Sequence, residues 1–216
     1  NGASGTLTEG AAWGEGRFGA AMDLGAATAH MEATYTPDLR LGGSDFTMTM
    51  WIRNSEKSGA AWAFMSANDG GGANLKWIWG YRDGASALHI NDLTGSFVWL
   101  ESNPWTPVAE RWTHVGLVRH GDTYTHYVDG RISGVVVSSR AFPVPVTGPF
   151  TIGSSETSFR FHGLVDEAAV FGQALSKDDI GRLMREGLEH IWATDATSLT
   201  GAVGVAASPE PAPAAT

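Results

Sequence analysis

The chain contains no cysteine among its 216 residues. It therefore has no disulfide bond and no thiolate metal site, and its fold must be held by packing and hydrogen bonds. It also has no stretch that approaches the ~20 apolar residues of a membrane-spanning helix. We therefore expect no membrane insertion. No signal peptide is recognisable, so if the protein is exported we expect this chain to be the mature form.

Positive charge is scarce, with 14 Lys and Arg against 23 Asp and Glu and a formal net charge of −9. This balance argues against nucleic acid and against anionic membrane surfaces as partners. Hydrophobic residues make up 43% of the chain, enough for a substantial core in one large domain. The 28 glycines are typical of a turn-rich, all-β chain.

The clearest structural pattern lies between Trp112 and Val137. Aliphatic residues lead to a turn at His120–Asp122, and residues 123–128 then alternate with the period of two that a strand requires. Asp129-Gly130 is a strong hairpin signal, because a type I′ turn needs positive φ at both central residues. This stretch therefore predicts three antiparallel strands joined by two turns.

Two further patterns complete the outline. Residues 45–53 and 75–81 alternate between two faces and predict strands. Ser176 and Asp179 have the spacing of a capping box, and apolar residues follow at helical spacing from Ile180 to Trp192. We expect one C-terminal helix with its apolar stripe against the sheets.

Four stretches, in order, carry a family resemblance: GAAMDLG, DFTMTMWIR, WTHVGLVR with TYTHYVDGR, and FHGLVDEAAVFGQALSKDDIGRL. Over roughly residues 17–188 the chain resembles the laminin-G-like, concanavalin A-like jelly rolls of bacterial secreted proteins. The resemblance implies an all-β, two-sheet antiparallel jelly-roll sandwich with one C-terminal helix. It implies an extracellular or cell-surface location but no single function, since the fold hosts several.

The composition divides the chain into three parts. Residues 1–16 are rich in Gly, Ala, Ser and Thr and form a leader or an edge arm; residues 17–193 form the jelly-roll domain. Residues 194–216 shift to Ala, Val, Gly and Pro. In this last part Val203 and Val205 alternate with small residues, so the segment can act as a strand. It either docks on its own domain or fills the sheet edge of a neighbouring subunit.

Catalysis is not expected. Some sugar-cleaving enzymes of the same jelly-roll class place two carboxylates at alternating positions of one strand. No glutamate of this chain has an aspartate two residues further on, and Asp166 and Glu167 are adjacent and face opposite ways. No persuasive Ser/His/Asp arrangement or phosphate-binding glycine loop is present.

Asp166 is the best candidate for a metal ligand, because a carboxylate in an apolar strand needs a partner. In jelly rolls of the family that the chain resembles, the matching aspartate binds a structural calcium ion. The resemblance makes the carbonyl of Gly25 the second ligand, although Ala26 and Ala27 stand where family members often have another acidic residue. The alternative is that Asp166 accepts backbone N–H bonds or pairs with an arginine.

Trp77, Trp79 and Tyr81 form an aromatic row on one face of a predicted strand. This row is either a platform on which sugars stack or part of the core. The sequence thus predicts a non-catalytic module: a self-assembling subunit of a surface filament that uses its terminal arms, or a lectin-like module that binds glycans with a structural calcium.

Overall fold

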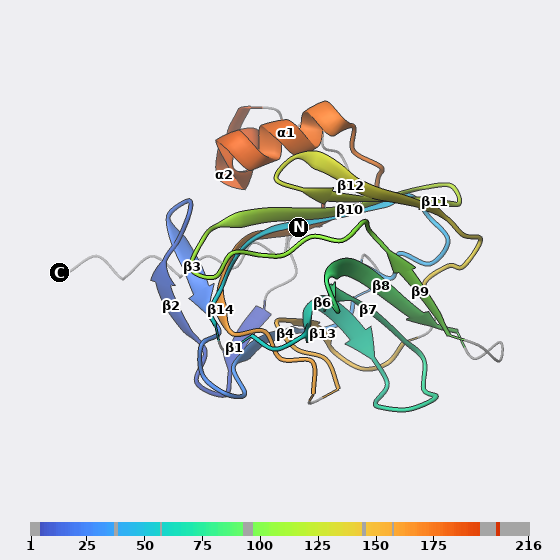
Figure 1. The fold of residues 1–216 in the computed structure, drawn as a ribbon, viewed down its shortest axis with the longest axis horizontal. Coiled ribbons are helices and arrows are strands. Elements are labelled where there is room, and N and C mark those ends of the chain that lie inside the picture. Colours follow the sequence, from blue (N-terminus) through green and yellow to red (C-terminus); the bar gives the residue numbers. More distant parts are fainter. Residues whose placement is uncertain are drawn as a thin grey trace.

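The computed structural model describes residues 5–36, 39–56, 58–92, 97–143, 146–156, 158–194 and 202–203. Two antiparallel sheets face each other, and two short helices cover the outer face of one of them (Figure 1). This confirms the predicted all-β jelly-roll sandwich.

Sheet A has the strand order β1 (Gly5–Thr8), β4 (His30–Ala33), β13 (Phe150–Ile152), β6 (Ala61–Asn68), β7 (Lys76–Arg82), β8 (Ala85–Asn91) and β9 (Val98–Glu101). Sheet B has the order β12 (Arg131–Val137), β11 (Thr123–Val128), β10 (Thr113–His120), β5 (Phe46–Asn54), β14 (Gly163–Phe171), β3 (Ala20–Asp23) and β2 (Ala12–Glu15), with β15 (Ala202–Val203) beside β14.

The predicted meander is confirmed as β10, β11 and β12. Asp129 and Gly130 have φ values of 48° and 70°, the positive values that a type I′ turn demands. The Asp129 carboxylate also accepts a hydrogen bond from the backbone N–H of His114 at 3.0 Å, which ties the turn to the neighbouring strand.

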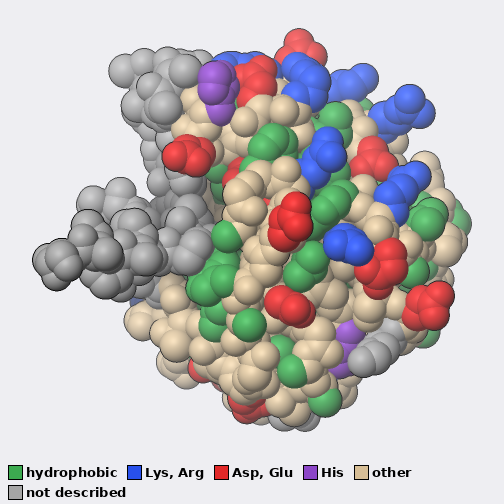
Figure 2. Space-filling view, turned by 90° about the vertical axis from the view of Figure 1, so that its left-hand side faces the viewer, with side chains coloured by type: hydrophobic (Ala, Val, Ile, Leu, Met, Phe, Trp, Pro, Cys, Tyr) green, Lys and Arg blue, Asp and Glu red, His purple; other side chains and the backbone are tan. Residues whose placement is uncertain are grey.

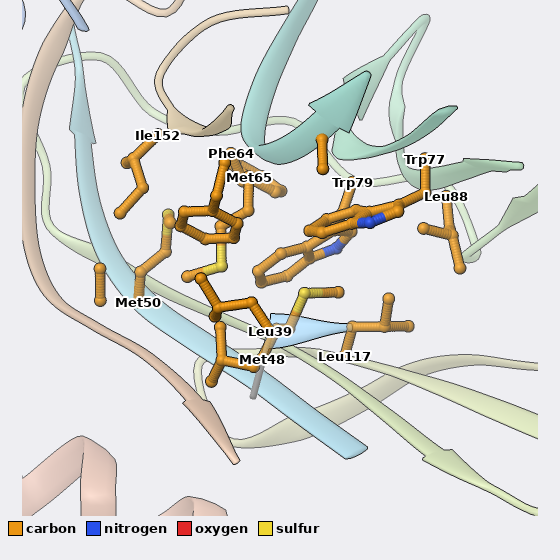
Figure 3. Packing of buried hydrophobic residues seen from close by; sticks show 14 of the residues in the cluster. Leu39, Met48, Met50, Phe64, Met65, Trp77, Trp79, Leu88, Leu117 and Ile152 are labelled. Carbon is orange, nitrogen blue, oxygen red and sulfur yellow. The ribbon is translucent and has the colours of Figure 1, made fainter. Parts of the chain in front are cut away.

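The main core lies between the sheets (Figure 3). Met48 and Met50 of β5 meet Trp77 and Trp79 of β7 there, and all four side chains are fully buried. The two indole N–H groups are satisfied: Trp77 donates to the Tyr35 hydroxyl at 3.1 Å, and Trp79 donates to the Ser86 hydroxyl at 3.2 Å. These two tryptophans thus fill the space between the sheets with their buried donors paired.

A second apolar cluster lies on the outer face of sheet B, beneath α1 (Lys177–Glu186) and α2 (Leu188–Thr194). The capping box of Ser176 and Asp179 is present as predicted. The expectation of a single helix is wrong, because Gly187 has φ 77° and ends α1 with its N–H bonded to the carbonyl of Leu183. Neither described helix is long and apolar enough to cross a membrane.

The described residues nearest both termini pair with the sandwich. Residues 5–15, expected to be a leader or an edge arm, supply β1 at the edge of sheet A and β2 at the edge of sheet B. Val203 pairs with Val170, so the described part of the C-terminal segment docks on its own domain. Docking within the same chain was one of the two predicted possibilities; Val205 lies outside the described residues.

A β-bulge in β14 directs two adjacent carboxylates to different elements: Asp166 accepts a hydrogen bond from the β2–β3 turn, and Glu167 accepts one from α2. The register of β14 against β5 shifts between Asp166 and Ala169, and Glu167 has φ 52°. This conformation turns the Glu167 carboxylate toward the start of α2, where it accepts the N–H of Leu188. Burial, together with the nearby Asp166 and Glu189 charges, raises the pKa of Glu167 to about 7.

We expect this carboxylate to make the protein less stable as the pH rises. The folded-state pKa lies above the unfolded value, so the folded state holds the extra proton between about pH 4.5 and 7, and stability falls across that window. Glu167→Gln keeps an acceptor for Leu188 and removes the charge. It should raise the free energy of unfolding at pH 8 by on the order of 3 kcal/mol and leave it nearly unchanged at pH 4.5.

Thermal and urea unfolding at both pH values test this, with Glu15→Gln, an exposed site on β2, as the matched control. Equal stabilisation at both pH values would show that charge burial is not the cause.

Candidate functional site

The outward surface of sheet A is the place where side chains are free to meet a ligand. Because Trp77 and Trp79 point into the core, the residues between and beside them must point outward. The register places Ile78 of β7 beside His89 of β8, and His89 beside Trp99 of β9. We call this surface the outer face of sheet A.

An aromatic stripe crosses the β8–β9 end of this face. Phe97, immediately before β9, lies 5.4 Å from the His89 ring, and Trp99 lies 4.5 Å from it on the other side. The Arg82 guanidinium then covers the Trp99 ring at 4.5 Å. Phe97 is 62% exposed and Trp99 is partly exposed, so this stripe presents ring faces and edges to solvent.

A shallow hollow of only about 10 Å³ adjoins the stripe, between Trp99 and Phe159. Its floor is low because Gly80 and Ala87 supply almost no side chain. Gly80 is required there, since a Cβ would lie 2.3 Å from the carbonyl oxygen of Trp62. The hollow is smaller than the roughly 300–1,000 Å³ of pockets that enclose a ligand. A ligand would therefore lie across this face.

The loop between β13 and β14 covers the other end of the outer face. Its Glu156 carboxylate forms a salt bridge with Lys76, whose side chain is only 3% exposed. The hydroxyl of Ser66 donates to the carbonyl of Ser154 at 2.9 Å. These contacts hold the loop over the sheet and leave the stripe near β9 as the open part of the face.

His89 is neutral and has spare hydrogen-bonding capacity. Its side chain is mostly buried under the two aromatic rings, and burial, followed by the Lys76 charge, lowers the pKa of its imidazole. Its buried Nδ1 has no hydrogen-bond partner among the described residues. Because this nitrogen is buried, the imidazole supports the Phe97 and Trp99 rings from beneath and does not present Nδ1 to solvent.

The aromatic row predicted as a platform lies elsewhere. Trp77 and Trp79 are wholly buried between the sheets, so the platform alternative is wrong for them and core filling is confirmed. Tyr81 is half-buried and stacks on Trp62 with ring centroids 5.0 Å apart. The alternation showed that Trp77 and Trp79 share a face of β7, but not that this face is buried. The exposed aromatic residues of sheet A lie instead at β9, where Trp99 pairs with His89 across the strands.

The structure separates the two residues predicted to share a calcium ion. The register pairs Leu164 with Asp23, and Leu24 bonds to Gly163, so Gly25 lies at the opposite end from Asp166. About four residues of strand, or about 13 Å, separate the two positions. Calcium–oxygen distances are about 2.3–2.6 Å, so one ion cannot bind both.

Asp166 instead binds the backbone. Its carboxylate accepts N–H bonds from Phe18 and from Glu167, each at 2.8 Å, and this holds the β2–β3 turn against β14. Burial raises the pKa of Asp166, and these hydrogen bonds oppose the shift. Within the described residues no group of three or more His, Asp or Glu side chains is placed to hold a metal ion. These contacts match the alternative in which Asp166 accepts backbone N–H bonds, and a calcium ion at Asp166 stays a prediction.

The carboxylates near the stripe are engaged with cations. Glu101 bonds to Arg82 at 3.1 Å, and Asp83 lies 3.5 Å from the same guanidinium. Glycoside hydrolysis needs one carboxyl group as a proton donor and a second carboxylate as a nucleophile or base. Carboxylates held by cations are poorly placed for those roles, so the geometry favours binding over cleavage.

Comparison with known proteins agrees with this architecture. Residues 28–181 match the family model of the concanavalin A-like lectin/glucanases superfamily. No curated protein matches the chain.

Three solved structures illustrate the fold. Domain 4 of AbnA, an extracellular GH43 arabinanase from Geobacillus stearothermophilus solved in complex with arabinotriose, has a TM-score of 0.69 at 17% identity; the match covers 84% of this chain and 88% of that one. The CBM40 of Ruminococcus gnavus IT-sialidase, bound to α2,3-sialyllactose, has a TM-score of 0.55 at 14% identity over 67% and 84% of the two chains. The binding domain of botulinum neurotoxin DC, in complex with SialylT, has a TM-score of 0.63 at 12% identity over 86% and 47%. At these identities the likeness shows the fold alone.

We expect the Lys76–Glu156 pair to hold the loop over the outer face. Glu156→Gln leaves a buried ammonium without its counter-charge and should lower the free energy of unfolding by roughly 3–5 kcal/mol. The double variant Lys76→Met/Glu156→Gln removes both charges and should recover most of that loss. Urea unfolding of both variants checks this; a double variant as unstable as the single one would contradict it.

Proposed function

We propose that this chain, which belongs to the concanavalin A-like lectin/glucanases superfamily, is a non-catalytic carbohydrate-binding module that acts outside the cell. Its glycan would lie across the outer face of sheet A, with a sugar ring against Trp99 and Phe97. The hydroxyl groups of that sugar would reach the polar side chains that flank the stripe, such as Arg82 and Glu101.

The observation that carries this proposal is the aromatic stripe itself. The Phe97 ring is 62% exposed and lies beside the partly exposed Trp99 ring, so neighbouring aromatic surfaces are available to a ligand. Aromatic ring faces bind the C–H surface of a sugar, while polar side chains at the edge of the site bind its hydroxyl groups. Ligand sites usually combine apolar area with a few placed polar groups in this way.

The surrounding charges favour a neutral sugar. Lys76 and Arg82, the cations nearest the stripe, are already paired with Glu156 and Glu101. An acidic sugar would have to break one of these pairs to gain a cation of its own. The arabinotriose bound to the AbnA domain is a neutral example on the same fold, and the extracellular origin of that domain agrees with the proposed location.

Trp99→Ala should reduce glycan affinity by roughly 30-fold, because an aromatic residue at the centre of a binding surface typically contributes about 2 kcal/mol. Trp13→Ala is the matched control, since Trp13 is 37% exposed on β2 of the other sheet. A glycan array followed by calorimetry on the best ligand provides the measurement. An equal loss in both variants, or no binding by the wild type to any glycan, would overturn the proposal.

Self-association is the second candidate function, and an exposed apolar patch on β12 favours it. Ile132, Val135 and Val137 are 51%, 56% and 74% exposed on the edge strand of sheet B. An edge strand can pair antiparallel with the same strand of a second copy, which would cover this patch. A filament would need a further, non-equivalent contact as well.

Val135→Lys should keep the protein monomeric at concentrations where the wild type associates, because an edge lysine opposes strand pairing. Val108→Lys, at a 53% exposed position in a loop, serves as the control and should behave like the wild type. Sedimentation velocity over a concentration series decides between the outcomes; a wild type that stays monomeric throughout removes this candidate.

A further inference from the structure

A second groove lies on the other side of the molecule from the outer face of sheet A. It runs between the β11–β12 turn and α1, and its volume is about 520 Å³. Its lining comprises Asp129, Gly130, Arg131, Lys177, Asp178, Gly181, Arg182, Met184 and Arg185. The proposed glycan site shares none of these residues, so the groove is a separate feature.

The groove concentrates positive charge on an acidic protein. Four of its lining residues are Lys or Arg, out of only 14 in the whole chain, whose net charge is −9. Figure 2 shows Lys and Arg side chains gathered toward the top of the molecule. The lining also includes the carboxylates of Asp129 and Asp178, but four cations against two carboxylates still leave a local positive excess on an acidic chain.

Three of the groove cations have no carboxylate partner. Among the described residues, the side chains of Arg131, Lys177 and Arg185 form no salt bridge. The Asp129 carboxylate cannot neutralise them fully, because it is bonded to Arg111 at 3.1 Å and to the His114 N–H at 3.0 Å. Free cations therefore face the groove.

The floor of the groove is small and apolar. Gly130 has positive φ in the hairpin turn and contributes no side chain, and Met184 lies against it within 3.3 Å of where a Cβ would be. Gly181 leaves the surface of α1 open, and the Arg185 guanidinium lies beside it. An open groove with an apolar floor and an excess of cations along its walls matches an extended chain that has apolar faces and regularly spaced anionic groups.

We propose that this groove binds an acidic polysaccharide, through carboxylate or sulfate groups that pair with Arg131, Lys177 and Arg185. The shape distinguishes this partner from other polyanions. A bilayer or a nucleic-acid duplex would bring a broad negative surface against a protein of charge −9, whereas one polysaccharide strand meets only the groove. The module would thus hold a neutral glycan on one side and an acidic one on the other.

Binding of fluorescently labelled polygalacturonate and dextran sulfate to the full chain tests the proposal, with neutral dextran as the blank. Wild-type protein should bind one or both anionic polymers at low salt and lose them at about 1 M salt, where the Debye length is about 3 Å. The carboxylate and sulfate polymers together show which anionic group the groove prefers.

Charge reversal then locates the site. Lys177→Glu and Arg131→Glu should each weaken binding by roughly tenfold, since each replaces an attraction with a repulsion. Arg40→Glu carries the same charge change at an exposed position outside the groove lining and should have little effect. Trp99→Ala should leave polyanion binding intact, which separates this proposal from the glycan site on sheet A.

Two results would overturn the proposal. The first is no binding of either polymer, or an equal loss in Lys177→Glu and Arg40→Glu, which would show only diffuse charge attraction. The second is stronger binding to phosphatidylglycerol vesicles or to duplex DNA than to the polysaccharides. Thermal melts of each variant confirm that the fold is retained before its affinity is compared.

Discussion

The alternation of side chains across paired strands decides where every other feature of this protein lies. Each sheet must bury one face against the other, so every strand residue that enters the core forces its neighbours outward. On β7 the burial of Trp77 and Trp79 places Ile78 and Gly80 outside, next to His89 and the partly exposed Trp99. The candidate glycan site is therefore a consequence of how the core is filled.

The same alternation determines which side chains lie on the outer face of each sheet, and the two outer faces are covered to different extents. On sheet B an apolar group of outward residues, which includes Val118 and Phe171, is covered by the helices. On sheet A the β13–β14 loop covers one end through Glu156, while the aromatic stripe near β9 stays open. The helices bring Lys177 and Arg185 beside the β11–β12 turn and so create the basic groove. One sandwich thus carries two chemically distinct surfaces on opposite sides.

Most of the fold could be predicted from the sequence, because strand period, turn chemistry and capping are local signals. The Asp129-Gly130 turn and the Ser176 capping box are examples. The helix break at Gly187 was missed because the apolar spacing continues across it. The site was harder: a period of two shows that Trp77 and Trp79 share a face, but only the partner sheet determines that this face is inside. Likewise, the sequence around Asp166 suggested a metal ligand, because it does not show that the fold places the backbone N–H of Phe18 beside that carboxylate.

Nuclear magnetic resonance of the tryptophan indoles tests the central claim most directly, because the nine tryptophans of the chain report on the core and on the surface at once. During titration with a neutral oligosaccharide, the indole N–H signal of Trp99 should shift progressively, while those of the buried Trp77 and Trp79 stay fixed. A titration in which Trp99 is unmoved while another surface tryptophan such as Trp13 responds would contradict the assignment of the glycan site to the outer face of sheet A.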